Sequence, residues 1–404
     1  MTNLYKLQFV TFEYAGITHP YTGGIGKWIA DLAPALAEYG HDVTVLTSDP
    51  YVSEAVQTPH GVSVHRVVIP PGGSGAARDL ARGLAWQRFV RKWLLGQPPA
   101  DLVIAPEWGG AAAAYAAAAP RPLLVTQLHG SGKQLRAHSP GRRQWGPRSA
   151  LPGWLTHRRE VLQTSHSDAV VGCSTAILND TVRRWKLDPP FRGVVPNILN
   201  IARARTLAKG SPPPLPEGRR VLFFGRLEPR KGTHVLAEAM TSVFACHPDV
   251  YLIVAGSDRG WRGAPMIEYV RACAGEHAER VVYLGELPPE ALMPLIKASD
   301  VVALPSLWEP FGFTFLEAMA LGRPLVSTSG HGADDFVTSG HDGLLVPSGD
   351  VQALAEAINR LLDDETLARA LGNRAARQAE QYAPDMGARR ATGVFEEILN
   401  QVNL

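Results

Sequence analysis

Short apolar runs recur along the whole chain and alternate with segments of helical periodicity. The runs are rich in Val, Ile, Leu and Phe, and they are continuous, whereas a half-exposed strand would alternate apolar and polar positions. Continuous runs indicate parallel strands buried on both faces, and the helices between them indicate βαβ units. The runs lie at 7–12, 42–47, 101–106, 123–128, 168–173 and 192–196 in the first half, and at 220–225, 250–256, 281–285, 300–305, 324–328 and 343–347 in the second.

The repeated pattern is interrupted at 201–218, IARARTLAKGSPPPLPEG, where apolar periodicity is lost and prolines cluster. Such a segment is typical of a semi-rigid linker. We therefore expect an N-terminal Rossmann-like domain at 1–200 and a C-terminal one at 219–385. A C-terminal helix at 386–404 could pack back on the N-terminal domain. The expected fold class is α/β, with two doubly wound parallel sheets facing each other across a cleft.

Composition supports an ordinary globular protein of two domains, since the chain has 404 residues, of which 45% are hydrophobic and 19% charged. A net charge of +2 gives no reason to expect nucleic acid as a partner. Cys173, Cys246 and Cys273 are few and scattered, which favours reduced thiols in the cytoplasm. The N-terminus lacks the pattern of a signal peptide, and the Ala-rich run 111–119 is too short to cross a bilayer.

Two glutamates flank a glycine in SLWEPFGFTFLEAMALG, residues 306–322. Glu309 should lie in a loop after a strand, and Glu317 about one turn into the following helix. Carboxylates accept hydrogen bonds from sugar hydroxyls, and the backbone N–H groups of Phe311, Gly312 and Phe313 at the helix start can donate to sugar oxygens. The alternatives are a solvated loop charge for Glu309 and stabilisation of the helix N-terminus for Glu317.

Two cations, Arg226 and Lys231, frame the start of a helix in FGRLEPRKG, residues 224–232. Cations beside a helix N-terminus favour a diphosphate, although solvated surface charges are the alternative. Together with Glu309 and Glu317 they describe a holder for a sugar, a diphosphate and a ribose, which is a nucleotide-sugar.

In the first half, Gly23 and Gly24 follow the first strand in YTGGIGKW, where a bare backbone can approach a ligand. The spacing is not that of a dinucleotide-binding GxGxxG, and no acid ends the next strand before Asp49, which argues against a dehydrogenase. His129 in LHGSGK ends another strand on the same side. The GSGK piece lacks the spacing of a phosphate-binding Walker loop.

The basic stretch 131–159 contains no acidic residue and is expected to line the acceptor side. Lys133, Arg136 and Trp145 within it, and Glu107 before it, are the acceptor-side candidates. The stretch would suit an anionic acceptor or a lipid head group, and a solvated loop is the alternative.

The segment 77–95 is amphipathic and basic, so it could dock on an anionic membrane at the inner face. Packing on its own sheet is the favoured interpretation. Its apolar face contains Leu80, Leu84, Trp86, Phe89, Val90 and Trp93, and Arg78, Arg88 and Lys92 lie opposite.

Over nearly its whole length the chain resembles a retaining glycosyltransferase of the family-4 type with the GT-B fold. The most specific match is E-x7-E, Glu309 to Glu317, and GRL-x3-KG, the glycine pair at 23–24 and His129 occur in the expected order. The chain differs from the family pattern at Ile198, His331 and Asp335, where Gly, Gly and Glu are usual.

The resemblance implies that Glu309 contacts the donor sugar and Glu317 the ribose, while Arg226 and Lys231 neutralise the leaving diphosphate. It implies further that His129 faces the transferred sugar, that the loop at 23–24 approaches phosphate and acceptor, and that backbone near Leu287 contacts the base. Retention is usually explained in this family by attack on the face that the phosphate leaves, with the departing oxygen taking the acceptor proton.

No Asp-x-Asp and no His/Cys cluster of metal-ligand spacing occurs in the sequence, so we expect a metal-independent enzyme without a cofactor. Its co-substrate would be a UDP- or GDP-linked sugar, and its partner a hydroxyl acceptor. A nucleotide-sugar epimerase of the same fold and a non-catalytic nucleotide-sugar binder remain alternatives. The sugar, the acceptor and the oligomeric state have no readable signal.

Overall fold

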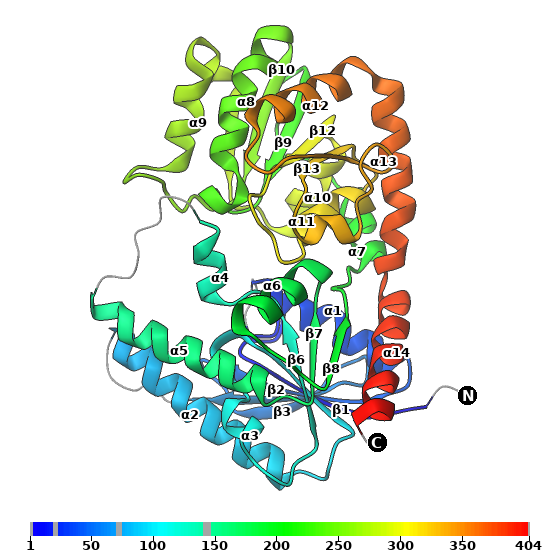
Figure 1. Ribbon diagram of the computed structural model, residues 1–404. Coiled ribbons are helices and arrows are strands. Elements are labelled where there is room, and N and C mark those ends of the chain that lie inside the picture. Colours follow the sequence, from blue (N-terminus) through cyan, green and yellow to red (C-terminus); the bar gives the residue numbers. More distant parts are fainter. Residues whose placement is uncertain (1–2, 19–22, 70–74, 140–146, 403–404) are drawn as a thin grey trace. The chain divides into compact units, whose positions relative to one another are not determined.

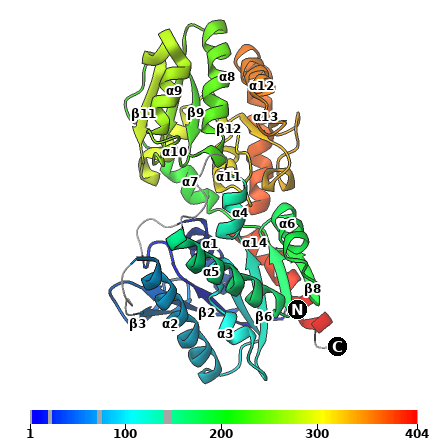
Figure 2. The same cartoon turned by 60° about the vertical axis from the view of Figure 1, so that its left-hand side comes forward.

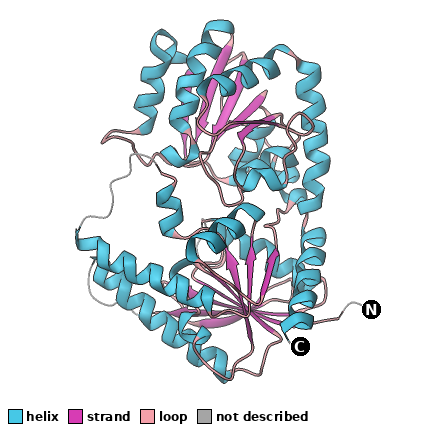
Figure 3. Cartoon of the chain, viewed as in Figure 1, coloured by secondary structure: helices cyan, strands magenta, loops and turns pink. Residues whose placement is uncertain are grey.

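The computed structural model describes residues 3–18, 23–69, 75–139 and 147–402, and its helices and strands are marked in Figure 3. Contacts divide the chain into two compact units. The first unit comprises Met1–Gln134, Arg143–Ile198 and Pro384–Leu404, and the second comprises Leu135–Arg142 and Leu199–Ala383. Each unit is an α/β structure around a predominantly parallel sheet, which confirms the expected fold class.

Within the described residues the first unit has an eight-stranded sheet, in the order β3-β4-β2-β1-β5-β6-β7-β8. All neighbours are parallel except β3 and β4. In chain order the strands are β1 (Lys6–Thr11), β2 (Asp42–Asp49), β3 (Glu54–Gln57), β4 (Ser63–Val68), β5 (Leu102–Pro106), β6 (Leu123–Leu128), β7 (Ala169–Gly172) and β8 (Phe191–Val194).

The strand order reverses direction between β1 and β5. Figure 1 labels β1 and β6 of this sheet. Because βαβ crossovers are right-handed, a reversal places helices on both faces of the sheet. The helices of this unit, with one 3₁₀ turn, are α1 (Gly24–Glu38), α2 (Gly75–Gly96), η1 (Trp108–Gly110), α3 (Ala113–Ala116), α5 (Pro147–Ser165), α6 (Thr175–Trp185) and α14 (Pro384–Val402). The boundary between the units runs through α4 (Gly132–Ala137).

Within the described residues the second unit has a six-stranded parallel sheet, in the order β11-β10-β9-β12-β13-β14, which reverses direction between β9 and β12. Its strands are β9 (Arg219–Phe224), β10 (Val250–Ala255), β11 (Val281–Gly285), β12 (Val301–Leu304), β13 (Leu325–Thr328) and β14 (Leu344–Val346). The expected strand runs of the second half all form strands of this sheet.

The helices and 3₁₀ turns of the second unit precede, connect and follow these strands. Figure 2 labels its helices α7 to α13. These helices and turns are α7 (Ile201–Leu207), η2 (Pro229–Lys231), α8 (Thr233–Cys246), α9 (Met266–Ala274), η3 (Gly275–Arg280), α10 (Pro289–Lys297), α11 (Phe313–Ala320), η4 (Gly332–Asp335), α12 (Val351–Asp363), α13 (Glu365–Ala379) and η5 (Glu380–Tyr382).

The segment expected as a linker, 201–218, begins with a helix instead of irregular chain. Ile201 and Ala204 of α7 are buried, and α7 packs against α10 and α11 inside the second unit. Only the proline-rich part after α7 has no regular structure. The C-terminal helix α14 belongs to the first unit, where it contacts α1 and β8.

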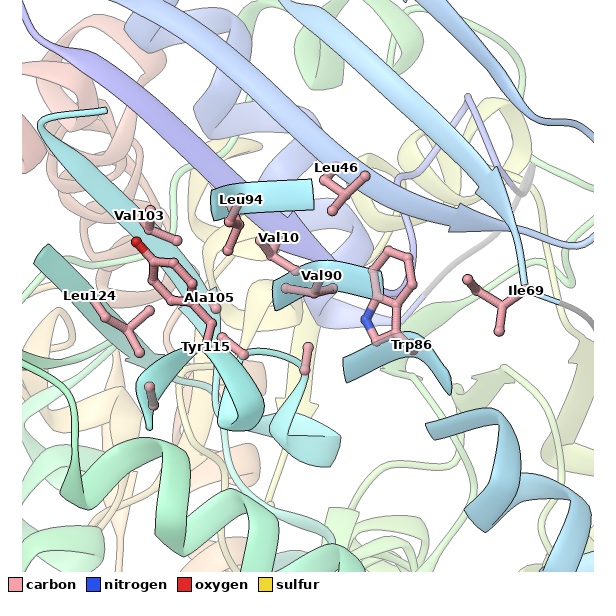
Figure 4. Close-up of a cluster of buried hydrophobic side chains, with 13 residues drawn as sticks. Val10, Leu46, Ile69, Trp86, Val90, Leu94, Val103, Ala105, Tyr115 and Leu124 are labelled. Carbon is pink, nitrogen blue, oxygen red and sulfur yellow. The ribbon is translucent and has the colours of Figure 1, made fainter. Parts of the chain in front are cut away.

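The apolar face of α2 is part of the core of the first unit. Figure 4 shows Trp86, Val90 and Leu94 of this helix meeting Val10 and Leu46 of the sheet. These side chains are at most 3% exposed. The favoured interpretation of 77–95, packing on its own sheet, is therefore confirmed for Trp86, Val90 and Leu94, whereas Leu84 is 37% exposed.

Candidate functional site

The most strongly charged candidate site lies in the second unit, at the carboxyl ends of β9 and β12, where the strand order reverses. Open α/β sheets bind ligands at such a point. The loop after β9 contains Arg226, Glu228 and η2, and the loop after β12 runs through Glu309 to the start of α11.

Glycine lets the two loops approach closely. Gly232 has φ +70°, and a Cβ there would lie 1.8 Å from the carbonyl oxygen of Pro305. The N–H of Leu307 donates to the carbonyl of Arg230 at 2.8 Å, so backbone contact joins the loops directly. The charged side chains on both loops are thereby brought together.

Glu309 is held by two consecutive cations. One oxygen of its carboxylate, Oε2, accepts from Lys231 Nζ at 2.6 Å and from Arg230 Nη1 at 2.8 Å. Arg230 also donates from Nη2 to Glu228 at 2.7 Å, and Arg226 Nη2 lies 3.3 Å from the same Glu228 oxygen. The five side chains form one network of three cations and two carboxylates.

Burial and charge act in opposite directions on these groups. Burial alone would raise the pKa of Glu309, but Lys231 and Arg230 hold it at about 2. Burial lowers the pKa of Lys231, and Glu309 opposes this effect. Burial acts against the charged form of Arg230 as well, but Glu309 and Glu228 raise its pKa. Glu309 is therefore an anion in any ordinary buffer, and its charge is fixed in place.

The two cations predicted from the sequence, Arg226 and Lys231, have different surroundings in the structure. Lys231 is a member of the pair on Glu309, whereas the side chain of Arg226 is 48% exposed and its nearest carboxylate is Glu228. Arg230, which sequence reasoning missed, is 3% exposed and central to the network. The only hint in the sequence is that Arg230 directly precedes Lys231. The sequence does not show which of two adjacent cations before a glycine is buried.

The start of α11 depends on Gly312. This residue has φ +100°, and a Cβ there would lie 2.4 Å from the ring of Phe315. Glu317 is 8% exposed in the same helix. The ring of Phe311 packs against Phe336 and Tyr382, so only its backbone remains for a ligand, and Phe313 begins the helix.

His331, at a position where the family usually has glycine, is fully buried beside this loop. Its Nδ1 accepts from the N–H of Ala333 at 3.2 Å, and its Nε2 lies 2.8 Å from Thr328 Oγ1. Burial lowers its pKa to about 4, so the ring is neutral. The next residue, Gly332, donates its N–H to the carbonyl of Glu309 at 2.9 Å. The substituted segment thus supports the Glu309 loop through its backbone.

In the first unit, His129 is presented by a turn that the buried carboxyl group of Glu107 holds. Both oxygens of Glu107 accept from the N–H of His129 at 2.9 Å, and one accepts from Gly130 at 2.6 Å. Glu107 is 0% exposed, and burial raises its pKa to about 8. The structure therefore places this acceptor-side candidate inside the unit, where it positions His129.

The imidazole of His129 lies 4.7 Å from the ring of Trp28, centroid to centroid. Burial lowers its pKa to about 3. Its Nε2 has no hydrogen-bond partner among the described residues. Because this nitrogen is itself buried, it could bind a ligand only after neighbouring atoms move.

The glycine loop carries an acid that sequence reasoning missed. Glu13 Oε1 accepts from the N–H of Gly26 at 3.1 Å and lies 3.2 Å from where a Cβ of Gly23 would be. Gly23 and Gly24 are exposed at the start of α1. Since Gly23 has no side chain to cap the helix, Glu13 supplies the capping oxygen from the loop after β1.

The remaining candidates are spread over other elements. Leu287 is half-buried after β11, Lys133 is exposed and Arg136 half-buried on α4, and Trp145 lies outside the described residues. In the described part of the chain, no group of three His, Cys, Asp or Glu side chains is arranged to hold a metal ion. No helix there is long and apolar enough to cross a membrane.

Two family models match the two halves of the chain. "Glycosyltransferase Family 4" matches residues 22–203, and "Glycosyl transferases group 1" matches residues 208–378. A glycogen synthase of Mycobacterium tuberculosis is 30% identical over 92% of this chain and 89% of its own length. A phosphatidyl-myo-inositol mannosyltransferase of Mycolicibacterium smegmatis is 27% identical over 95% of this chain and 93% of its own length.

Solved structures show the same fold. A sucrose-phosphate synthase from Thermosynechococcus elongatus gives a TM-score of 0.75 at 22% identity, covering 98% of this chain and 99% of that one. Anabaena Alr3699/HepE in complex with UDP-glucose gives 0.67 at 21% identity, covering 97% and 100%.

Proposed function

Because the chain belongs to the GT-B glycosyltransferases of the family-4 type, we propose that it moves a hexose from a nucleotide-diphosphate donor to an acceptor hydroxyl with retention of configuration. The observation that carries the donor assignment is Glu309, held by Lys231 and Arg230 at the reversal point of the second sheet. This arrangement offers a fixed carboxylate beside a cluster with an excess of positive charge.

The charge balance favours an anionic ligand at this site. Three cations and two carboxylates leave one positive charge unmatched within the network. Arg226 is the half-exposed cation and can turn toward a diphosphate, whereas Arg230 is committed to Glu228 and Glu309. We assign Arg226 and Lys231 to the leaving diphosphate and Arg230 to the positioning of Glu309.

In the proposed reaction the bond between the anomeric carbon and the diphosphate oxygen breaks, and the acceptor oxygen bonds to that carbon on the same face. The acceptor proton passes to the departing phosphate oxygen, while the cations stabilise its charge. Glu309 orients the sugar through its hydroxyls and Glu317 the ribose. No step requires a metal or a cofactor.

A thermal unfolding experiment tests the donor site first. We expect one of UDP, GDP, ADP or dTDP at high concentration to raise the Tm, since a ligand at a hundred times its Kd adds about 2.7 kcal/mol to the stability of the folded state. The gain should be lost in Glu317→Ala and kept in Glu356→Ala, an exposed glutamate on α12.

Stabilisation by none of the four nucleotides would remove the donor-site assignment. Stabilisation by NAD alone would favour a dehydrogenase and contradict the transferase. The mutant pair distinguishes loss of ribose binding from a general effect of removing one carboxylate.

A further inference from the structure

Helix α5 of the first unit turns polar side chains inward and apolar ones outward. Leu151, Trp154 and Leu162 are 63%, 50% and 39% exposed, whereas Glu160 and Gln163 are 3% and 0% exposed. The exposed residues follow helical spacing and lie along one side of the helix. A helix that only covers a sheet has the opposite polarity, with its apolar side facing the core.

The inward polar side chains fix the rotation of the helix. Gln163 donates to the carbonyl of Pro106 at 3.0 Å and to Thr126 Oγ1 at 3.2 Å, and it accepts from the N–H of Ala112 at 2.8 Å. Glu160 accepts from the N–H of Gly109 at 3.2 Å. Turning the apolar side inward would leave these buried groups unpaired at about 1–3 kcal/mol each, so the apolar stripe stays outside.

The surface around the stripe is cationic. Arg158 lies on the stripe itself, with its guanidinium 5.0 Å from the ring of Trp154. The neighbouring helix α2 packs beside α5, where a Cβ on Gly83 would meet Arg159 at 3.4 Å (Figures 1 and 2). Its exposed cations are Arg82, Arg88, Arg91 and Lys92. Among the described side chains of these two helices the only carboxylate is the buried Glu160.

We propose that this surface, the α5 stripe with the cations of α2, docks the protein on an anionic lipid bilayer. Trp side chains suit the boundary between head groups and acyl chains, and each Arg or Lys near an anionic leaflet adds attraction. A second copy of the chain is disfavoured as the partner of this surface, because two such surfaces in contact would bring like charges together. Docking goes beyond the proposed transfer reaction and does not depend on it.

The contact differs from insertion of the amphipathic segment 77–95. Trp86, Val90 and Leu94 of that segment are committed to the core, so α2 contributes charge and α5 contributes the apolar side chains. Such a contact is peripheral, shallow and sensitive to salt.

Vesicle flotation tests the proposal on the full chain. We expect the protein to float with vesicles that contain phosphatidylglycerol and phosphatidylcholine at low salt, and to remain below with phosphatidylcholine alone. Arg88→Ser/Arg158→Ser should weaken the binding by roughly fivefold per cation. Arg183→Ser/Arg369→Ser removes the same charge from exposed arginines elsewhere and should have little effect.

An apolar pair of variants separates docking from simple charge attraction. Leu151→Ser should weaken binding by roughly tenfold, because it removes an inserted side chain. Leu4→Ser is the matched control, since Leu4 is 62% exposed but packs beside Gly40 away from the stripe. Circular dichroism of each variant shows that it is folded.

Equal binding to neutral and anionic vesicles, or equal effects of Leu151→Ser and Leu4→Ser, would overturn the proposal. So would absence of vesicle binding together with a monomer–dimer equilibrium that Leu151→Ser shifts toward the monomer, since the stripe would then be an interface between copies.

Discussion

Lys231 and Arg230 are adjacent cations that reach the same oxygen of one carboxylate, at 2.6 and 2.8 Å. Two cationic partners offset most of the free-energy cost of burying the charge of Glu309. Without Glu309, Lys231 and Arg230 would be buried without this anionic partner. The residue that carries the donor assignment is therefore also a residue on which the local fold depends. Any variant at this position has to be judged by stability as well as by activity.

Glu309→Gln should lower the free energy of unfolding by about 3–5 kcal/mol at pH 7, because it leaves Lys231 and Arg230 without their anion. Since the pKa of Glu309 is about 2 in the folded chain and near 4.3 in the unfolded chain, its contribution is complete above about pH 4.5 and is lost as the pH falls through 2. The difference from wild type should therefore shrink by roughly 2 kcal/mol at pH 3. Denaturant unfolding at both pH values measures it.

Arg226→Gln is the control, since this side chain is half exposed and should cost under about 1 kcal/mol. Equal losses in the two variants would contradict the buried pair.

His129 is buried as a neutral ring, with a pKa of about 3 against an ordinary value near 6.5. The unfolded chain gains a proton as the pH falls below 6.5, but the folded chain does not, so the folded state loses stability there. The loss from this residue should be about 1 kcal/mol between pH 7 and pH 5.5. In His129→Phe this part of the pH dependence should be missing, and unfolding at the two pH values checks it.

His166 provides the comparison for that experiment. It is an exposed histidine just after α5, so His166→Phe removes a histidine without touching a buried one. If the two variants behave alike, His129 is not held neutral in the folded chain.

At the scale of elements, the loops after β12 and β13 each contain a glycine in the left-handed region of backbone conformation. Gly312 and Gly330 both have a positive φ, at +100° and +91°, but only Gly312 faces a crowded environment. A Cβ on Gly312 would overlap the Phe315 ring, whereas a Cβ on Gly330 meets nothing within 4 Å. Alanine variants at the two positions therefore distinguish the free-energy cost of backbone strain from the cost of steric overlap.

Gly330→Ala should cost about 1–2 kcal/mol of unfolding free energy, through backbone strain alone. Gly312→Ala should cost roughly 1–3 kcal/mol more, because the start of α11 has to move. The same shift should weaken nucleotide binding in Gly312→Ala only, since α11 carries Glu317. Denaturant titration and nucleotide-dependent Tm shifts measure the two effects.

The elements show where sequence reasoning succeeds and where it fails. Continuous apolar runs were sufficient to find the parallel strands, because burial on both faces leaves a strong signal. Strands β3 and β4 were missed, since β3 is exposed throughout and pairs antiparallel at the sheet edge. Helix α7 was missed because it is short and precedes the prolines of 212–216, which dominate the segment.

The site was predicted as a set of positions, but not as a network. The order of motifs located Glu309, Glu317 and Lys231, because they follow strand ends. Arg230 and Glu13 were missed, since which cation is buried and which acid caps a helix depends on contacts between segments distant in sequence.

At the scale of the whole molecule, the chain forms two sheets, and the strand order of each sheet reverses at its own point. The charged network lies in the second unit, and His129 lies in the first. Each unit has its own candidate residues, so variants in one unit can be tested for donor binding without altering the other.

We expect the complete enzyme to release nucleoside diphosphate and form a glycosylated product in the presence of a chelator, because the proposed mechanism uses cationic side chains at the leaving group. The measurement is product formation with and without EDTA and added Mg²⁺ or Mn²⁺. Activity that EDTA abolishes and a divalent ion restores would contradict metal independence. An isomerised nucleotide-sugar without any acceptor would indicate the epimerase instead.

The C-terminal helix α14 belongs to the first unit, and this has a consequence for how the protein folds during synthesis. Helix α14 covers α1, but Pro384–Leu404 leaves the ribosome only after the entire second unit has been made. At about 5–20 residues per second, the roughly 350 residues between α1 and α14 leave the apolar surface of α1 uncovered for about 20–70 s. During that interval the second unit can fold completely while the first cannot, so the nascent first unit is the part that would need a chaperone.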